Sequence, residues 1–207
     1  MSFPHIYINV RNENGDTPLN IVITNNNLYV ATALLRRPDL NVDPDLYVRN
    51  PIYSAANFGN AACLKILLES KKFEVEFNNI YYSPLFASTP NNCIECVGIL
   101  LQYVADAQPE ETRKRLQQIL DNDLESVSAS INANDFDINQ DFRSGWRVLH
   151  IAIYLRNIQL LSLLLSHPQI DVNMEDGHHA TPLSLACIAE LADVVKLLLK
   201  HQHIQPN

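Results

Sequence analysis

The chain has 207 residues, 47% of them hydrophobic, and its 15 Lys and Arg against 23 Asp and Glu give a formal net charge of −8. This charge disfavours nucleic acid and anionic membranes as partners, because both are bound by clustered cations, and the basic run 113–115 has acidic neighbours. No stretch of 18 apolar residues occurs, the N-terminal residues show no secretory signal, and four cysteines make no disulfide framework, so we expect a cytoplasmic protein.

A small polar residue followed by proline recurs at a fixed spacing along the chain. Thr17-Pro18, Asn50-Pro51 and Ser83-Pro84 are 33 residues apart, and Thr181-Pro182 begins a later copy. Thr, Ser and Asn are good helix caps, and proline suits the first helical position. Each copy therefore predicts a short helix, a polar break and a second helix with leucines at helical spacing.

Residues 84–146 hold a less regular part of the pattern. Arg147 begins another copy 64 residues after Ser83, which is close to two periods. Pro109 and the acidic residues after it are typical of a helix start, so we predict a degenerate unit here. We expect an enlarged loop or an extended helix end over residues 102–112.

Short extended pieces follow several of the second helices, at residues 74–76, 137–139 and 171–173. Gly15 and Gly145 each stand two residues before a helix start, where a tight turn favours glycine. These pieces predict a projecting, hairpin-like finger in each unit.

The repeat predicts an all-α solenoid, because units that stack on copies of themselves bury a continuous core. We expect a single domain over residues 1–207, with about six helix-turn-helix units and short β-hairpin-like fingers. The approximate unit boundaries are 8–42, 43–75, 76–108, 109–138 (the degenerate unit), 139–172 and 173–207.

The pattern resembles the ankyrin repeat, whose signature is Thr-Pro-Leu-His, a small Ala pair, Gly, a Val-Leu-Leu helix and Asp-Val-Asn. The signature His occurs only at His150, where Arg147 replaces the Thr, and Pro90 cuts into one first helix. The resemblance implies that fingers and first helices line a concave, protein-binding face. In style, the divergent repeats are also similar to ankyrin effectors of intracellular bacteria, which reach a host cytosol by non-classical export.

Two groups of residues could be interpreted as metal sites. Cys93-x-x-Cys96 is half of a zinc pattern without a second pair, and Cys63, Cys96 and Cys187 fall on positions that favour buried thiols. His178 and His179 stand near two acidic residues, on what we expect to be an exposed polar finger. The sequence therefore predicts no metal and no cofactor.

No catalytic constellation is apparent. His150 has no nucleophile on a strand-to-helix elbow and no Gly-rich oxyanion or phosphate loop to work with. Asn139 and Asn173 lie in fingers and resemble asparagines that a hydroxylase modifies, although hydrogen bonding to the finger backbone is the simpler interpretation.

Aromatic and Arg side chains concentrate at finger and helix-end positions that we expect to be exposed, as in interface hot spots. Trp146 and the Tyr81-Tyr82 pair are the strongest candidates for contacting a partner. The predicted partner-binding set is Tyr47, Arg49, Phe58, Tyr81, Tyr82, Phe142, Arg143, Trp146 and Tyr154.

The sequence thus favours a monomeric, non-catalytic scaffold that binds another protein through its concave face. One alternative is a targeting or substrate-recruiting module of a larger enzyme or secreted effector. A weaker alternative is an enzyme with a site in residues 102–146 that uses Glu110, Glu111 and Asp123.

Overall fold

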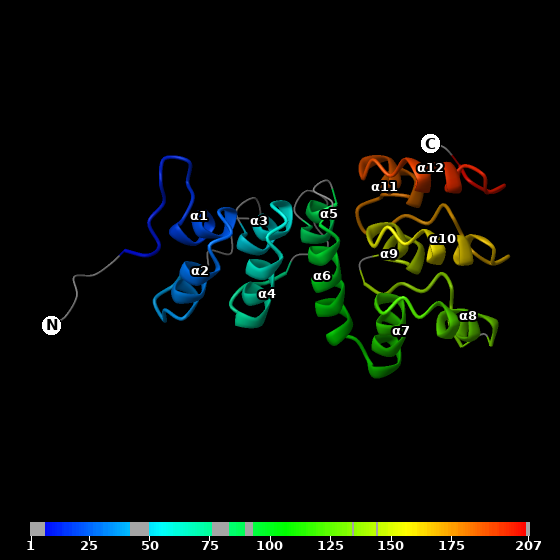
Figure 1. The fold of residues 1–207 in the computed structure, drawn as a ribbon, viewed down its shortest axis with the longest axis horizontal. Coiled ribbons are helices and arrows are strands. Elements are labelled where there is room, and N and C mark those ends of the chain that lie inside the picture. The colour runs from blue at the N-terminus through cyan, green and yellow to red at the C-terminus, as the bar shows by residue number, and fades with distance from the viewer. Residues whose placement is uncertain are drawn as a thin grey trace. The chain divides into compact units, whose positions relative to one another are not determined.

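A computed structural model of the chain describes residues 7–41, 50–75, 83–89, 93–133, 135–143 and 145–205. The described residues form twelve helices in six consecutive pairs and contain no strand (Figure 1). The predicted all-α class of helix-turn-helix units is confirmed. The described residues fall into two compact units, unit 1 up to Cys96 and unit 2 from Val97 onward. One continuous domain stays a prediction.

Unit 1 is built from two rows of short helices. Its helices are α1 (Pro18–Thr24), α2 (Leu28–Leu35), α3 (Pro51–Asn57), α4 (Ala61–Ser70), α5 (Pro84–Ser88) and the first turn of α6 (Ile94–Asp106). Helix α3 packs against α1 and α5, and α2 packs against α4 (Figure 1). The apolar sides meet in a core that includes Ile23, Ile52, Leu64 and Leu85, all with no exposed surface.

Unit 2 repeats the arrangement with the rest of α6. Its other helices are α7 (Glu110–Leu120), α8 (Leu124–Asn132), α9 (Val148–Tyr154), α10 (Ile158–Leu165), α11 (Pro182–Ile188) and α12 (Ala192–Leu198). Helix α9 packs against α10 and α11, α10 against α12, and α7 against α8. The degenerate unit is thus a helix pair, and the extended helix end expected within 102–112 is the last turn of α6.

The helix starts follow the capping chemistry read from the sequence. The predicted cap side chains accept a hydrogen bond from the first turn at Thr17 (Asn20 N, 3.2 Å), Asn50 (Ile52 N, 2.8 Å), Ser83 (Phe86 N, 3.5 Å) and Thr181 (Ser184 N, 3.2 Å). At α9 the bond is reversed, because the Arg147 N–H donates to His150 Nδ1 over 3.4 Å. One free N–H group in the first turn of each of these helices is therefore satisfied without a neighbouring repeat.

The fingers are tight turns that share a backbone hydrogen bond at equivalent positions. The N–H groups of Asn12, Phe142 and Asp176 donate to the carbonyls four residues later, over 2.9 to 3.0 Å. Asparagine side chains then join one finger to the next: Asn173 Nδ2 donates to His203 O over 2.7 Å, and Asn173 Oδ1 accepts from Gln205 N over 2.8 Å. Asn9 and Asn139 make the same pair of bonds. The hydrogen-bonding interpretation of the finger asparagines is confirmed, with the next finger as partner; modification stays a prediction.

We expect Asn173→Ala to lower the free energy of unfolding by about 1–3 kcal/mol, because it removes two hydrogen bonds to the backbone. Chemical denaturation followed by circular dichroism measures the loss. Asn173→Asp is the comparison variant: it keeps an oxygen that accepts from Gln205 N, but it replaces the donor with a charged oxygen that faces His203 O. Amide exchange at Gln205 should quicken in the Ala variant and much less in the Asp variant; equal quickening in both would contradict the role of Oδ1.

Gly145 stands where two fingers approach closely. Its φ is +77°, and a Cβ there would lie 2.5 Å from Gly177 N and 2.6 Å from the Asp176 carbonyl carbon. Gly59 has a similar φ of +69°, yet a Cβ there would meet no closer atom than Cys93 Cβ at 3.5 Å. The two glycines therefore share the backbone requirement but differ in space.

Alanine substitutions at Gly145 and Gly59 separate the effect of backbone strain from that of steric overlap. Gly145→Ala should lower the free energy of unfolding by about 2–5 kcal/mol, since it adds overlap to left-handed strain. Gly59→Ala should cost only about 1–2 kcal/mol of strain. Urea unfolding of both variants tests this, and equal losses would show that the fingers can move apart at no cost.

Candidate functional site

The predicted partner-binding residues divide into three groups in the structure. Tyr47, Arg49, Tyr81 and Tyr82 lie outside the described residues, so their exposure stays a prediction. Phe58 and Arg143 are exposed, as expected. Phe142, Trp146 and Tyr154 are buried, and the expectation that they are exposed is wrong.

Packing between neighbouring repeats explains the three buried rings. All seven residues of α9 are buried, because α10 and α11 cover it, and Tyr154 is the last of them. Trp146 lies just before this helix with its ring 6.3 Å from that of Tyr154. Phe142 packs 6.2 Å from Phe136. These side chains pack inside unit 2 and have almost no exposed surface with which to contact a partner.

The exposed Phe58 belongs to a row of turns that link the two helices of each repeat in unit 1. The Asn60 side-chain amide, in the turn between α3 and α4, donates to Ile23 O over 2.7 Å at the end of α1. Cys93, at the start of α6, places its Sγ 3.6 Å from Gly59 O as a hydrogen-bond donor. Consecutive turns are therefore directly joined and lie side by side.

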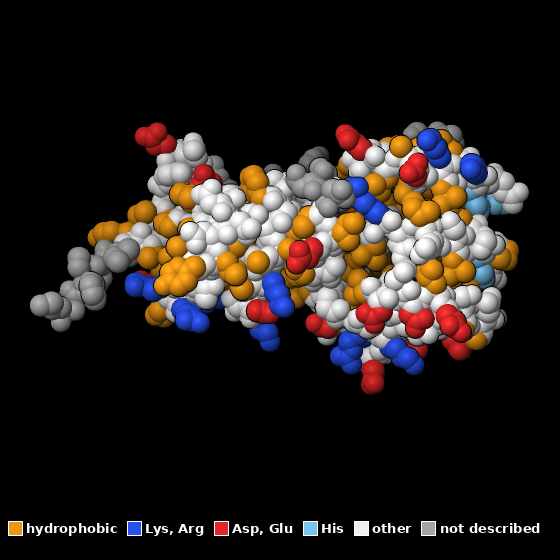
Figure 2. All heavy atoms as spheres, in the orientation of Figure 1, with side chains coloured by type: hydrophobic (Ala, Val, Ile, Leu, Met, Phe, Trp, Pro, Cys, Tyr) orange, Lys and Arg blue, Asp and Glu red, His pale blue; other side chains and the backbone are white. Residues whose placement is uncertain are grey.

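Large apolar side chains project from these joined turns and from the first residues of the helices that follow them. Tyr29 is 85% exposed, Phe58 57%, Ile94 47% and Leu28 40%. We name this set, Leu28, Tyr29, Phe58 and Ile94, the turn surface. Hydrophobic side chains are visible among polar ones over α1 to α4 in Figure 2. Clustered exposed apolar side chains of this kind are typical of interaction sites.

Sequence reasoning found Phe58 and missed the other three members. Leu28, Tyr29 and Ile94 lie in the first turns of α2 and α6, where an apolar residue also matches the spacing of a buried helix side. Their position within the repeat could have identified two of them, because Leu28 and Ile94 both stand eleven residues after a helix-capping Thr or Ser. The equivalent residue in the second repeat is the small Ala61, which is buried.

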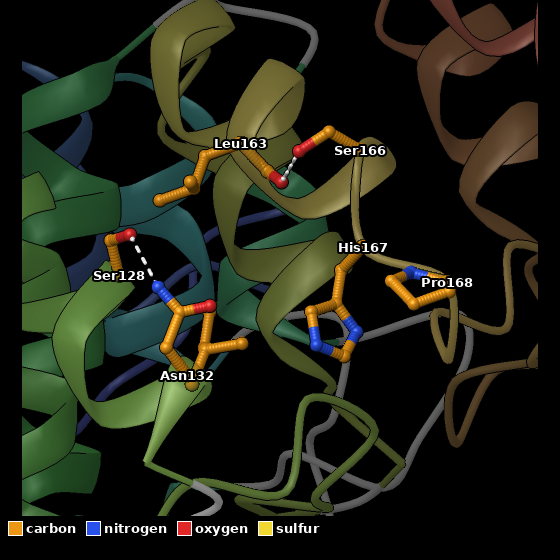
Figure 3. Close-up of a pocket in the computed structure, with 7 residues that line it drawn as sticks. Ser128, Asn132, Leu163, Ser166, His167 and Pro168 are labelled. Atoms are coloured by element: carbon orange, nitrogen blue, oxygen red, sulfur yellow. Dashed lines mark hydrogen bonds between the residues drawn. The ribbon is translucent and has the colours of Figure 1, made fainter.

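A shallow hollow of about 190 Å³ lies between α8 and α10 in unit 2 (Figure 3). It is lined by Ser128, Ile131, Asn132, Leu163, Ser166, His167 and Pro168. Its polar groups bond locally: Asn132 Nδ2 to Ser128 Oγ over 3.5 Å, and Ser166 Oγ to Leu163 O over 2.7 Å. No carboxylate, Lys or Arg lines it, so the hollow offers no convergent set for catalysis or ion binding.

The candidate catalytic residues have structural roles in the structure. Asp123 Oδ1 caps α8 by accepting from Ser126 N over 3.1 Å, and this bonding lowers the pKa of Asp123. Glu111 pairs with Arg115 on the same helix over 3.3 Å. His150 is fully buried, with Nε2 3.2 Å from Ala180 O. Nothing brings these groups together.

The candidate metal ligands do not converge either. His178 is buried, contrary to the exposed finger we expected, whereas His179 is exposed and lies 2.9 Å from Glu175 Oε2. Cys63 and Cys96 are buried as expected; Cys187 is exposed, and its predicted burial is wrong. Across the described ranges, no group of three or more His, Cys, Asp or Glu is arranged to hold a metal ion. None of the described helices is long and apolar enough to cross a membrane.

His150 makes the fold sensitive to acid. Desolvation by burial lowers the pKa of His150 from 6.5, and the positive charge of Arg147 lowers it further. The negative charge of Asp176 and the hydrogen bond to Ala180 O act in the opposite direction, but the effect of desolvation is larger. The unfolded chain therefore binds the proton more readily than the folded one. The part of the stability that depends on His150 is therefore fully present above pH 6.5 and decreases as the pH falls below it.

The free energy of unfolding should decrease by up to about 1.4 kcal/mol per pH unit below 6.5 on account of His150. Urea titrations between pH 7.5 and 5 measure the slope. His150→Gln has no titrating ring, so its slope should be shallower by that amount. Parallel slopes for the two proteins would assign the acid sensitivity to other groups, such as His178.

A protein-family model described as ankyrin repeats (3 copies) matches residues 3–80 and 117–207, which is more than half of the chain. The human transient receptor potential cation channel subfamily A member 1 is 26% identical over 212 residues, covering 94% of this chain and 18% of the channel chain. Alpha-latrotoxin-Lhe1a of Latrodectus hesperus is 33% identical over 67 residues, covering 32% of this chain and 5% of the toxin. The chain thus spans less than a fifth of the length of these relatives.

Two solved structures are similar to the chain. An ankyrin repeat domain from Acinetobacter baumannii AYE has 21% sequence identity and a TM-score of 0.43, over 89% of this chain and 97% of that one. The ankyrin repeat domain of Bcl-3, a member of the IκB protein family, has 19% identity and a TM-score of 0.43, over 91% and 87%.

Proposed function

Because the chain belongs to the ankyrin repeat family, whose domains generally mediate protein–protein interaction and are typically non-catalytic, we propose that it is a binding scaffold for a partner protein. The proposed contact is the turn surface of unit 1. The observation that carries this proposal is the exposure of Tyr29 and Phe58 on turns that are joined by hydrogen bonds.

The chemistry of the turn surface suits a hot spot. Tyr29 offers a large ring with a polar end, and Phe58, Leu28 and Ile94 add apolar area around it. Aromatic side chains bury much surface and lose little rotamer freedom on binding. The bonds from Asn60 and Cys93 fix the turns that carry Phe58 and Ile94, so little ordering is left for the binding step.

The fingers form a second proposed contact region, on the concave face that the family resemblance implies. Arg143 is its exposed member among the described residues, and Tyr47, Arg49, Tyr81 and Tyr82 are proposed on sequence alone. We propose that the scaffold is monomeric and acts in the cytoplasm or, if exported, in a host cytosol. The low number of cysteines, four in 207 residues, is compatible with a reducing compartment.

The turn surface is tested by a double variant, Tyr29→Ala with Phe58→Ala. Both side chains are exposed, so the variant should fold with a stability close to the parent's. Captured from a lysate of the source cells and quantified by mass spectrometry, its partners should bind at least about tenfold more weakly, as expected for loss of hot-spot residues.

The matched control is Leu199→Ala, which removes a side chain of similar exposure from the end of α12 in unit 2. This variant should keep every partner. If the folded double variant also keeps every partner at unchanged affinity, the turn surface is not the contact. Tyr81→Ala with Tyr82→Ala applies the same assay to the finger region.

A second candidate function is that of a recruiting module within a longer protein, such as an enzyme or a secreted effector. In both curated relatives the matched segment is a small part of a much longer chain, 18% and 5% of it. The size of the natural protein on an immunoblot of source cells separates the two proposals. A band near the mass of this chain, 23.4 kDa, favours the free-standing scaffold.

A further inference from the structure

Two cysteines at the start of α6 lie in direct contact. The Sγ atoms of Cys93 and Cys96 are 2.8 Å apart, and both residues are free thiols. Cys93 is the residue before the helix, and its sulfur also accepts a hydrogen bond from Cys96 N over 3.3 Å. A disulfide bond is about 2.05 Å long, so the sulfurs need to approach by only about 0.8 Å.

No other repeat has cysteine at both of these positions. At the position of Cys93, Asn27 and Asn157 cap their helices with a side-chain oxygen, over 3.1 and 2.9 Å. At the position of Cys96, the last repeat has Val194, which is also buried. A sulfur cap and a buried apolar residue are each compatible with the fold alone. Their coincidence as two thiols in contact adds a chemical capacity that the other caps lack.

We propose that Cys93 and Cys96 are a modification site that closes reversibly to an intrahelical disulfide when the chain meets a small-molecule disulfide of the glutathione type. This inference does not rest on the turn surface binding a partner.

Exposure assigns the two sulfurs different roles. Cys93 is partly exposed, whereas Cys96 has no exposed surface. Burial, followed by the hydrogen bond to Cys93, strongly raises the pKa of the Cys96 thiol and keeps it protonated at neutral pH. Cys93 is therefore the sulfur that an oxidant reaches first, and Cys96 is the resolving thiol.

The reaction is two thiol–disulfide exchanges. The Cys93 thiolate attacks one sulfur of oxidised glutathione, the glutathione disulfide breaks, and one glutathione leaves as a thiolate. Cys96 then attacks Cys93 Sγ, its proton passes to the departing sulfur, and the second glutathione leaves as a thiol. Two protein thiols are oxidised, one glutathione disulfide is reduced to two thiols, and the short distance makes the second step intramolecular.

The test uses the intact reduced chain and oxidised glutathione as the probe. After incubation, the chain is unfolded in an alkylating agent, digested and analysed by mass spectrometry. The peptide containing Cys93 and Cys96 should lose both alkylation sites and weigh two hydrogen atoms less than the dithiol, and excess reduced dithiothreitol should restore both sites. Cys187, which is exposed and has no cysteine neighbour within its helix, should instead gain one glutathione.

Two variants follow the order of steps. Cys96→Ser should trap glutathione on Cys93, and Cys93→Ser should leave Cys96 unmodified while Cys187 still reacts. Circular dichroism checks that each variant remains folded. The experiment on the parent chain tests the proposal even if a variant fails to fold. Full alkylation of Cys93 and Cys96 under conditions that glutathionylate Cys187 would overturn the proposal, as would a persistent glutathione adduct on Cys93 in the parent chain.

Discussion

The described helices are too short to be stable alone in water, and the rest of the structure depends on that constraint. The helices are five to thirteen residues long, and isolated helices of this length are marginal in water. Within each unit, apolar residues are buried between neighbouring pairs, as α3 shows between α1 and α5 in unit 1. Burial supplies most of the cohesion, but it is not directional. Polar side chains add the register: Asn60 reaches the end of α1, and Asn173 bridges two fingers with both ends of its amide.

The fold could be predicted because local and non-local signals agree in phase. Thr17, Asn50, Ser83 and Thr181 mark helix starts through a bond to their own first turn, so the sequence shows them without knowledge of any neighbour. The same is true of Gly145, whose φ and close approach to Gly177 both require glycine. The degenerate unit could be placed from Pro109 and two periods of spacing. The end of α6 at Asp106 could not be fixed, because no capping signal stands in residues 102–108 and helix ends are set by packing as well as propensity.

The candidate site could be predicted only in part, since exposure depends on which neighbour covers a residue. Phe58 follows a helix and precedes a glycine turn, and it is exposed. Trp146 and Phe142 occupy finger positions that are exposed in a generic repeat, yet in this chain large rings fill the space under the finger. A side chain of that size on a short finger can pack inward, and neither periodicity nor composition records its direction. Tyr29 was missed for the opposite reason: it matches the apolar pattern of a helix but lies at its first turn, where α4 does not cover it.

In the turns between helices, hydrogen bonds therefore fix the backbone, whereas the side chains vary from one repeat to the next. Asn26, Gly59 and Arg156 all adopt the left-handed conformation that ends the first helix, whatever their side chains, and hydrogen bonds from the next repeat fix the turn. The rings of Tyr29 and Phe58 are not needed for packing, because both are largely exposed. Leaving their apolar surface in water forgoes the stabilisation that its burial would give. The fold likewise accepts oxygen in place of the sulfur of Cys93, since Asn27 and Asn157 cap equally well. Functions specific to this chain are best sought at such positions. A residue there could be replaced without loss of the fold, yet it exposes apolar surface to water or carries a reactive group.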